Sequence, residues 1–155
     1  MMLNALELKI PPPVVALLLG VAAWWLAPVS PALAWPEALR IGLTVLLALL
    51  GLTLDFSGLV AFVRRHTTIN PLSPRKSTAL VTSGVYRFTR NPMYLGLACL
   101  LTAWAIWLGA WLPFAAPVLF VLYITRFQIQ PEERVLAQLF GPAFTDYTGR
   151  VRRWI

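Results

Sequence analysis

The amino-acid sequence predicts an all-α, polytopic integral membrane protein with about four transmembrane helices and a short cytoplasmic C-terminal helix. Hydrophobic residues make up 59% of the 155 residues, and the mean hydropathy is +0.72. Charged residues make up 12%, against roughly 25% in a typical soluble domain. These charges lie between and after long apolar runs, as they do in the flanks of membrane helices. A soluble fold with this composition would lack the polar groups needed to cover its surface.

The first two predicted spans are residues 14–34 and 41–63, each long enough for the roughly 20 residues that a span requires. The first run ends near Trp35, and aromatic residues favour the membrane interface. No clean cleavage site follows it, so we expect it to be retained rather than removed as a signal peptide. The second run ends on a basic cluster at residues 64–66, which is typical of the cytoplasmic side of a membrane.

The second half of the chain begins with the longest polar segment, whose interspersed apolar residues predict that it is ordered against the membrane. A run without charged residues follows, and Gly109 and Pro113 interrupt it near its middle, which predicts a tight hairpin. The elements expected here are a polar segment at 67–91, membrane helices at 92–108 and 111–127, and a separate, non-spanning helix from Gln130 that Gly141 and Pro142 end.

The length fits one membrane domain covering residues 1–155, with an N-terminal helix pair at 14–63 and a functional core at 70–155. Arginine and lysine gather around residues 64–90 and from residue 126 onward, whereas the two short links carry almost no positive charge. The positive-inside rule therefore places both termini in the cytoplasm. The formal net charge of +7 belongs to these membrane flanks, so it does not indicate a face that binds nucleic acid.

The segment Arg90-Asn91-Pro92 predicts the start of a helix at the membrane face. Asn91 is a favourable cap, and Pro92 suits the first helical position. The free backbone N–H groups of a helix start attract an anion, and Arg90 beside them is better placed if an anion binds between them. The alternative is that Arg90 is a basic anchor to lipid phosphates, and the spacing does not choose between the two.

Three acidic residues are further candidates. Glu132 and Glu133 follow Pro131, where acids commonly stabilise the start of a helix, although one of them could face a polar pocket. Asp55 lies inside the second apolar run, and an acid in a membrane is usually functional or paired. Arg64 and Arg65 follow about two helical turns later, so we weigh a substrate contact for Asp55 equally against a deep snorkelling or interhelical ion pair.

The single cysteine and the single histidine of the chain do not indicate a catalytic or metal site of their own. The chain has one cysteine, Cys99, inside an apolar run, and one histidine, His66, in a basic cluster. A single histidine and a single cysteine cannot supply the usual zinc sites, so we expect no metal. The aromatic and basic residues of the tail predict either an interfacial anchor or a lid over a pocket, and Arg153 is expected to matter little for ligand binding.

The second half of the chain carries a specific order of motifs. They are Leu80-Val81-Thr82-Ser83-Gly84-Val85-Tyr86-Arg87, Arg90-Asn91-Pro92-Met93-Tyr94-Leu95-Gly96, the charge-free hairpin, Glu132-Glu133, Phe140-Gly141, Tyr147 and Arg150-Val151. This order resembles the isoprenylcysteine carboxyl methyltransferase family, and its prokaryotic branch in particular, over about residues 70–155. The eukaryotic members have histidine where this chain has Asn91 and proline where it has Arg152.

The resemblance implies an enzyme of the prokaryotic inner membrane that transfers a methyl group from S-adenosylmethionine to a membrane lipid or a lipidated small molecule. It implies that Arg90 and Glu133 belong to the catalytic centre. The residues implied to bind the cofactor are Val85, Tyr86, Arg90, Asn91, Pro92, Tyr94, Glu132 and Glu133. Asp55, Tyr147 and Arg150 are the candidates for contact with the acceptor.

Two other classes of protein compete with this interpretation. A non-catalytic scaffold or assembly factor could keep the same fold, and binding of S-adenosylmethionine would distinguish the two. A small transporter would need broken helices with polar sites near the middle of the membrane, and the charge-free hairpin supplies few such groups.

Overall fold

Proline residues mark where most of the helices begin. Pro12, Pro92 and Pro142 each occupy the first turn of a helix, and Pro36 directly precedes another. Proline is favoured there because its fixed φ suits the helix and its missing N–H would have no partner in the first turn. The helices are α1 (Pro12–Leu26), α2 (Glu37–Arg64), α3 (Pro92–Leu108), α4 (Ala115–Ile124), α5 (Gln130–Phe140) and α6 (Pro142–Arg150).

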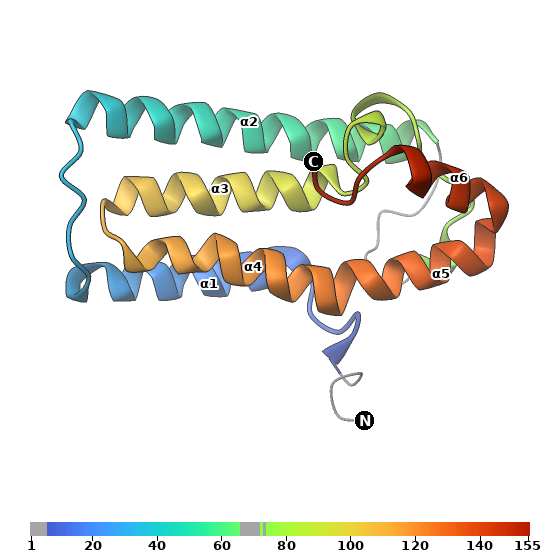
Figure 1. Cartoon of the computed structure of the whole chain (residues 1–155), viewed down its shortest axis with the longest axis horizontal. Helices are drawn as coiled ribbons and strands as arrows, with labels where there is room; N and C mark the ends of the chain where they lie inside the picture. The colour runs from blue at the N-terminus through green and yellow to red at the C-terminus, as the bar shows by residue number, and fades with distance from the viewer. Residues whose placement is uncertain (1–5, 66–71, 73) are drawn as a thin grey trace.

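A computed structural model describes residues 6–65, 72 and 74–155 of the chain. The four helices α1 to α4 run lengthwise beside one another, with α3 between α2 on one side and α1 and α4 on the other (Figure 1). α5 continues the line of α4 past the start of α3, and α6 turns back so that the C-terminus lies beside the start of α3 (Figure 1). The described residues contain no strand, only one isolated bridge between Ala32 and Ala110.

The predicted helical membrane fold is confirmed. Among the described residues, three helical stretches are long and apolar enough to cross a membrane: Pro12–Val29, Glu37–Arg64 and Leu112–Phe140. α3 is equally apolar but has 17 residues, fewer than the roughly 20 that a perpendicular span requires. A fourth span therefore stays a prediction. The hairpin turn lies where the sequence placed it, because α3 ends at Gly109, whose φ of +65° suits glycine.

The first helix is shorter than the predicted run 14–34. α1 ends at Leu26 and a 3₁₀ turn, η2, continues to Val29, after which the chain is not helical up to Pro36. Prolines at positions 28 and 31 lack the N–H donors that would extend the helix. The non-helical link instead bonds to the hairpin, since Leu33 N–H donates to the Gly109 carbonyl at 2.8 Å.

The helix predicted from Gln130 is present as α5, but it is not separate from the helix before it. A π-helical turn, η6 (Thr125–Ile129), joins α4 to α5 without a break. Pro131 lacks the N–H that would have bonded to the Phe127 carbonyl, and the wider turn accommodates it. The freed Phe127 carbonyl accepts a hydrogen bond from Leu8 N–H at 3.0 Å, which ties the N-terminal segment to this junction.

A glutamate in the N-terminal segment strengthens that attachment. Glu7 pairs with Arg126 at 2.7 Å and also with Arg134, so it connects the π-helical turn to α5. The hydrogen bond from Arg126 is the main cause that lowers the pKa of Glu7 below its ordinary value.

The polar segment before α3 is built from two short 3₁₀ turns, η3 (Pro74–Lys76) and η4 (Gly84–Arg87). Tyr86 of η4 packs edge-on against Phe62 of α2, with ring centroids 5.5 Å apart, and is itself buried. This described part of the segment is thus packed against α2, whereas its order against the membrane stays a prediction. His66 and the remainder of residues 66–71, with residue 73, lie outside the described residues.

Candidate functional site

A cavity of about 470 Å³ lies where the end of α2 and the starts of α3 and α5 meet η4 and α6. Its volume falls within the range of small-molecule sites, roughly 300–1,000 Å³. Apolar side chains supply most of the wall, including Phe62, Met93, Leu97 and Leu136. The polar and ionisable residues in the wall are Asp55, Ser77, Tyr86, Arg90, Asn91, Tyr94, Glu132, Glu133 and Tyr147.

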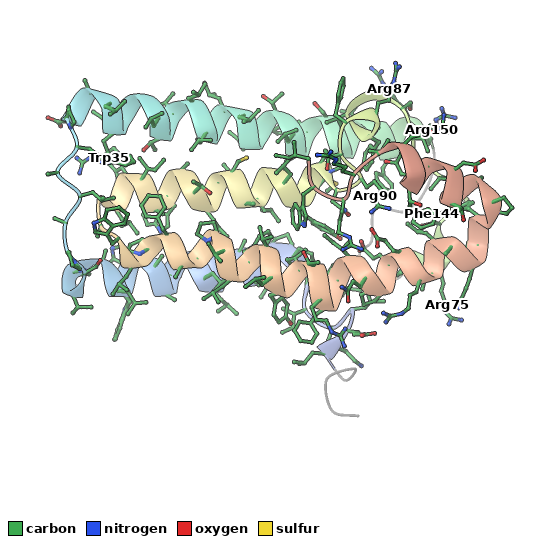
Figure 2. All side chains as sticks on the ribbon, in the orientation of Figure 1. Trp35, Arg75, Arg87, Arg90, Phe144 and Arg150 are labelled. Carbon is green, nitrogen blue, oxygen red and sulfur yellow. The ribbon has the colours of Figure 1, made fainter. Side chains whose placement is uncertain are left out.

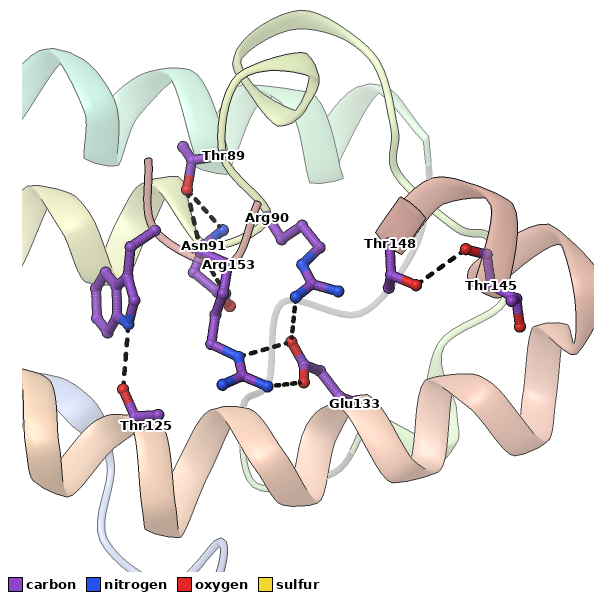
Figure 3. A network of polar contacts seen from close by, with 9 residues as sticks. Thr89, Arg90, Asn91, Thr125, Glu133, Thr145, Thr148 and Arg153 are labelled. Atoms are coloured by element: carbon purple, nitrogen blue, oxygen red, sulfur yellow. Dashed lines mark hydrogen bonds and ion pairs between the residues drawn. The ribbon is translucent and has the colours of Figure 1, made fainter. Parts of the chain in front are cut away.

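Glu133 is held between two arginines (Figure 3). Arg153 binds it with a two-pronged contact, Nε to Oε1 at 3.1 Å and Nη2 to Oε2 at 2.6 Å. Arg90 Nη2 approaches Oε1 at 3.2 Å. All three side chains are at least partly buried, and such pairs are stronger than the same contacts in water. The hydrogen bond with Glu133 also raises the pKa of Arg153, which stays charged.

Arg90 differs from its neighbour Arg87 in where it points. Arg87 is exposed at the outer surface, whereas Arg90 lies between the start of α3 and α5 (Figure 2). The Nε atom of Arg90 is buried and has no hydrogen-bond partner among the described residues. A buried N–H without a partner is costly, so this atom is a ready donor for an anion in the cavity.

Glu132 points toward α3 rather than toward the arginines. Its Oε1 atom accepts hydrogen bonds from Tyr94 Oη at 2.7 Å and from Gln128 Nε2 at 2.6 Å. Among the described residues no group bonds to Oε2, which is therefore available to a ligand. Stabilisation of a helix start does not explain the two acids, because α5 follows the π-helical turn without a break and both acids have tertiary partners.

Two tyrosines close the side of the cavity formed by η4 and α6. Tyr147 Oη donates a hydrogen bond to the Tyr86 backbone carbonyl at 2.7 Å. Burial raises the pKa of Tyr147 to about 12. Burial also raises the pKa of Tyr86, and the nearby Tyr147 and Glu132 add to this effect. Both phenols therefore stay protonated and neutral across the physiological range.

Asp55 lines the cavity from the side of α2. Its carboxylate packs directly against Gly96 of α3, where a side chain would clash with it. The alternative of an ion pair with Arg64 or Arg65 is not seen, since the ion pairs of the described residues do not include Asp55. The position of Asp55 agrees with the other alternative, a contact with a ligand.

Asn91 occupies the predicted start of α3 but does not cap it. Its side-chain amide donates to the Arg153 carbonyl at 3.0 Å, and no side chain caps the helix. The N–H groups of Met93 and Tyr94 consequently have no hydrogen-bond partner within the described part of the chain. Both of these residues line the cavity. The helix start is confirmed, whereas the predicted capping bond, in which the Asn91 side-chain oxygen would accept from a helix N–H, is not formed.

Three of the residues expected at the site lie outside the cavity wall. Pro92, the first residue of α3, is buried against Gly58 of α2. Val85 contributes its carbonyl to the turn of η4. Arg150 is exposed, and its Nε donates to the Asp146 carbonyl one helical turn away at 3.2 Å (Figure 2). This bond turns the Arg150 side chain back along α6, and its contact with the acceptor stays a prediction.

The residue that sequence reasoning missed is Arg153. We expected it to matter little, whereas it forms the two-pronged pair with Glu133. A signal was present in the sequence, because Arg153 directly precedes Trp154 and an aromatic neighbour can fix an otherwise loose tail. Trp154 does so here, with its Nε1 atom donating to Thr125 Oγ1 at 3.1 Å. Gln128, almost fully buried beside Glu132, was also missed.

No group of three or more histidine, cysteine, aspartate or glutamate side chains that could hold a metal occurs in the described ranges. Cys99 is partly buried within α3 and is not among the residues that line the cavity.

The fold and the site together define a membrane-embedded helical protein with a polar, small-molecule-sized cavity at one end of its bundle. A family model of the phospholipid methyltransferases matches residues 39–143, which covers α2 from its third residue, α3 to α5 and most of the cavity wall. The chain belongs to the phospholipid methyltransferase family.

A protein from Haemophilus influenzae described as uncharacterized is 43% identical over 63 residues, which is 41% of this chain and all of that protein. No solved structure matches the chain. Family membership implies a membrane-associated methyltransferase, and such enzymes generally use S-adenosylmethionine. The resemblance noted from the motifs is thus supported at the level of the shared superfamily of isoprenylcysteine and phospholipid methyltransferases.

Proposed function

We propose that this protein transfers the methyl group of S-adenosylmethionine to an amphiphilic acceptor in the cytoplasmic leaflet of a prokaryotic inner membrane. One observation carries the proposal. The cavity places Arg90 and two carboxylates next to an apolar wall, at the end of helices apolar enough to cross a membrane. A water-soluble, zwitterionic cofactor and an apolar acceptor need those two kinds of surface side by side.

The residues of the cavity fit the charged groups of the cofactor. The unpartnered Nε of Arg90 and the free N–H groups at the start of α3 suit its carboxylate. The free Oε2 of Glu132 suits its ammonium group or a ribose hydroxyl. The face of a tyrosine such as Tyr94 suits the sulfonium cation. Glu132 fits the direct role better than Glu133, because both oxygens of Glu133 already bind arginines.

The apolar wall fits the chain of the acceptor. Phe62 and Met93 lie on α2 and α3, and Leu136 lies on α5, so the wall continues the apolar surface of the bundle. An acceptor can therefore enter from the lipid while the cofactor enters from the water. Asp55 and Tyr147 are the polar residues we assign to the polar end of the acceptor. The acceptor class comprises lipids and lipidated molecules that carry a carboxylate, thiol or amine.

The cofactor supplies an activated methyl group, which moves to the acceptor atom while the carbon–sulfur bond breaks and its electron pair stays on sulfur. The protein needs only to align the two reactants and exclude water. Arg90 and Glu132 hold the donor, and the apolar wall keeps the acceptor dry. A carboxylate or thiolate acceptor needs no base, whereas an ammonium acceptor must first lose a proton, for which Glu132 and Asp55 are the cavity carboxylates that no arginine pairs with.

The test is transfer of a labelled methyl group from S-adenosylmethionine to the organic phase of a membrane extract. We expect label in that phase with the wild-type protein and little with Arg90→Ala. Arg152→Ala is the matched control, because the side chain of Arg152 is exposed and lines no part of the cavity. Label confined to water-soluble products would refute entry from the lipid. Cofactor binding without any transfer would instead support the non-catalytic scaffold.

A further inference from the structure

We propose that Arg153 is a positioning residue, which holds Glu133 so that Arg90 stays free to bind the carboxylate of the cofactor. The inference rests on the proposed function of the cavity. Arg153 does not line the cavity, so it would act on a ligand only through the residues it touches. The contacts that carry the inference belong to the last residues of the chain, which cross the start of α3 (Figure 3).

The backbone of the tail fixes where Arg153 lies. The Arg152 carbonyl accepts from Arg90 N–H at 3.0 Å, and the Arg153 carbonyl accepts from the Asn91 amide at 3.0 Å. Thr89, which is buried, adds a bond to the same Arg153 carbonyl at 3.3 Å. Trp154 then anchors the end of the tail against Thr125 and the apolar core. The tail is thus fastened on both sides of the arginine.

Arg153, rather than Arg90, binds the Glu133 carboxylate in the more favourable two-pronged geometry. A planar guanidinium bonds a carboxylate best with two parallel contacts, and Arg153 makes both of them. Arg90 is left with one contact, at 3.2 Å, to an oxygen that Arg153 already shares. The Nε atom of Arg90 consequently has no partner within the described residues. Arg153 therefore keeps Arg90 from closing fully onto Glu133.

The charges of the three groups lead to the same conclusion. Two guanidinium groups and one carboxylate leave one net positive charge beside the cavity, where the anionic end of a ligand can use it. Without Arg153 this cluster would be neutral, and Arg90 would be the only partner of Glu133. Arg90 would then rotate to make the two-pronged contact itself and withdraw its free N–H from the cavity.

The experiment compares two ligands that differ in the carboxylate alone, S-adenosylmethionine and decarboxylated S-adenosylmethionine, in calorimetric titrations of the full chain in detergent. We expect Arg153→Ala to weaken binding of S-adenosylmethionine about tenfold and to leave binding of the decarboxylated ligand unchanged. Arg153→Lys keeps the charge without the two-pronged geometry, so it should recover part of the lost affinity. Arg152→Ala removes the same charge one residue earlier, keeps the backbone contact and should bind both ligands as the wild type does.

The outcomes separate this inference from a merely structural role. Equal weakening of both ligands by Arg153→Ala would show that the tail only closes the cavity, and would overturn the inference. So would an unchanged affinity for both ligands, or equal losses in Arg152→Ala and Arg153→Ala. A wild-type protein that binds neither ligand would instead overturn the proposed function on which the inference rests.

Discussion

Replacing Gly96 by alanine tests the closest contact between α2 and α3. A Cβ atom at Gly96 would lie 2.7 Å from the Gly51 carbonyl oxygen and would also clash with the carboxylate of Asp55. A Cβ atom at Gly51 would lie 2.8 Å from the Gly96 carbonyl oxygen. The close approach therefore depends on both glycines, as it does in many packed membrane helices.

The backbone carbonyl cannot rotate away, so the two helices must separate. Ordinary contact begins at 3.4 Å, and moving from 2.7 Å to that distance requires a shift of about 0.7 Å along the line of contact. Overpacking of this kind typically costs about 1–3 kcal/mol. The Asp55 side chain must move as well, so we also expect weaker binding of any ligand that it contacts.

The assay is reversible unfolding of the purified protein by increasing denaturing detergent. Gly42→Ala is the matched control, because Gly42 lies on the same helix α2 and a Cβ there would meet nothing within 4 Å. We expect Gly96→Ala to lower the free energy of unfolding by about 1–3 kcal/mol and Gly42→Ala to leave it unchanged or slightly higher. Equal effects of the two substitutions would refute the close packing of α2 on α3.

Three further predictions concern Glu132 in the cavity, the attachment of the N-terminal segment and the orientation of the protein in the membrane. Glu132→Gln keeps an acceptor oxygen but loses the charge, so calorimetry should show normal folding with cofactor affinity reduced about tenfold or more. Arg126 lowers the pKa of Glu7, so the contact that attaches residues 6–10 is fully present at pH values above 4.5, the ordinary pKa of a glutamate. The attachment is lost as the pH falls through the lower pKa that Glu7 has in the folded protein. Amide hydrogen exchange in residues 6–10 should therefore become faster in acid. In the variant Glu7→Gln it should already be faster at pH 7. A cysteine placed at Lys76, in a chain without Cys99, should react with a membrane-impermeant label only after the cells are opened, and labelling of intact cells would exclude a cytoplasmic position.

The helices were predictable where proline, glycine and charge mark their ends. Pro92 and Gly109 bound α3 as expected, and Gly141 separates α5 from α6. The junction at Pro131 was not predictable by the same rule. Proline usually ends a helix, but here a π-helical turn accommodates it and the N-terminal segment supplies the donor for the freed carbonyl. That compensation comes from Leu8, more than a hundred residues earlier, which local patterns cannot reveal.

The residues of the site were easier to predict from the sequence than the hydrogen bonds and ion pairs between them. The spacing of Arg90, Glu132 and Glu133 left their roles open, and the family resemblance implied that they bind a ligand. All three line the cavity. Their partners depend on tertiary contacts between segments that are far apart in the sequence. Arg153 reaches Glu133 only because the tail crosses the start of α3. Tyr94 reaches Glu132 only because the fold brings the first turn of α3 close to the first turn of α5.

The central claim is that the cavity beside Arg90 binds S-adenosylmethionine. Ultraviolet cross-linking of S-adenosylmethionine carrying a labelled methyl group, followed by peptide mapping of the purified protein, tests it most directly. We expect label on peptides that contain Tyr86, Tyr94 or Tyr147, all of which line the cavity, and loss of that label in the presence of excess S-adenosylhomocysteine. Label that S-adenosylhomocysteine does not displace, or label that fragmentation of the peptides assigns to Tyr123, which lies outside this cavity, would contradict the claim.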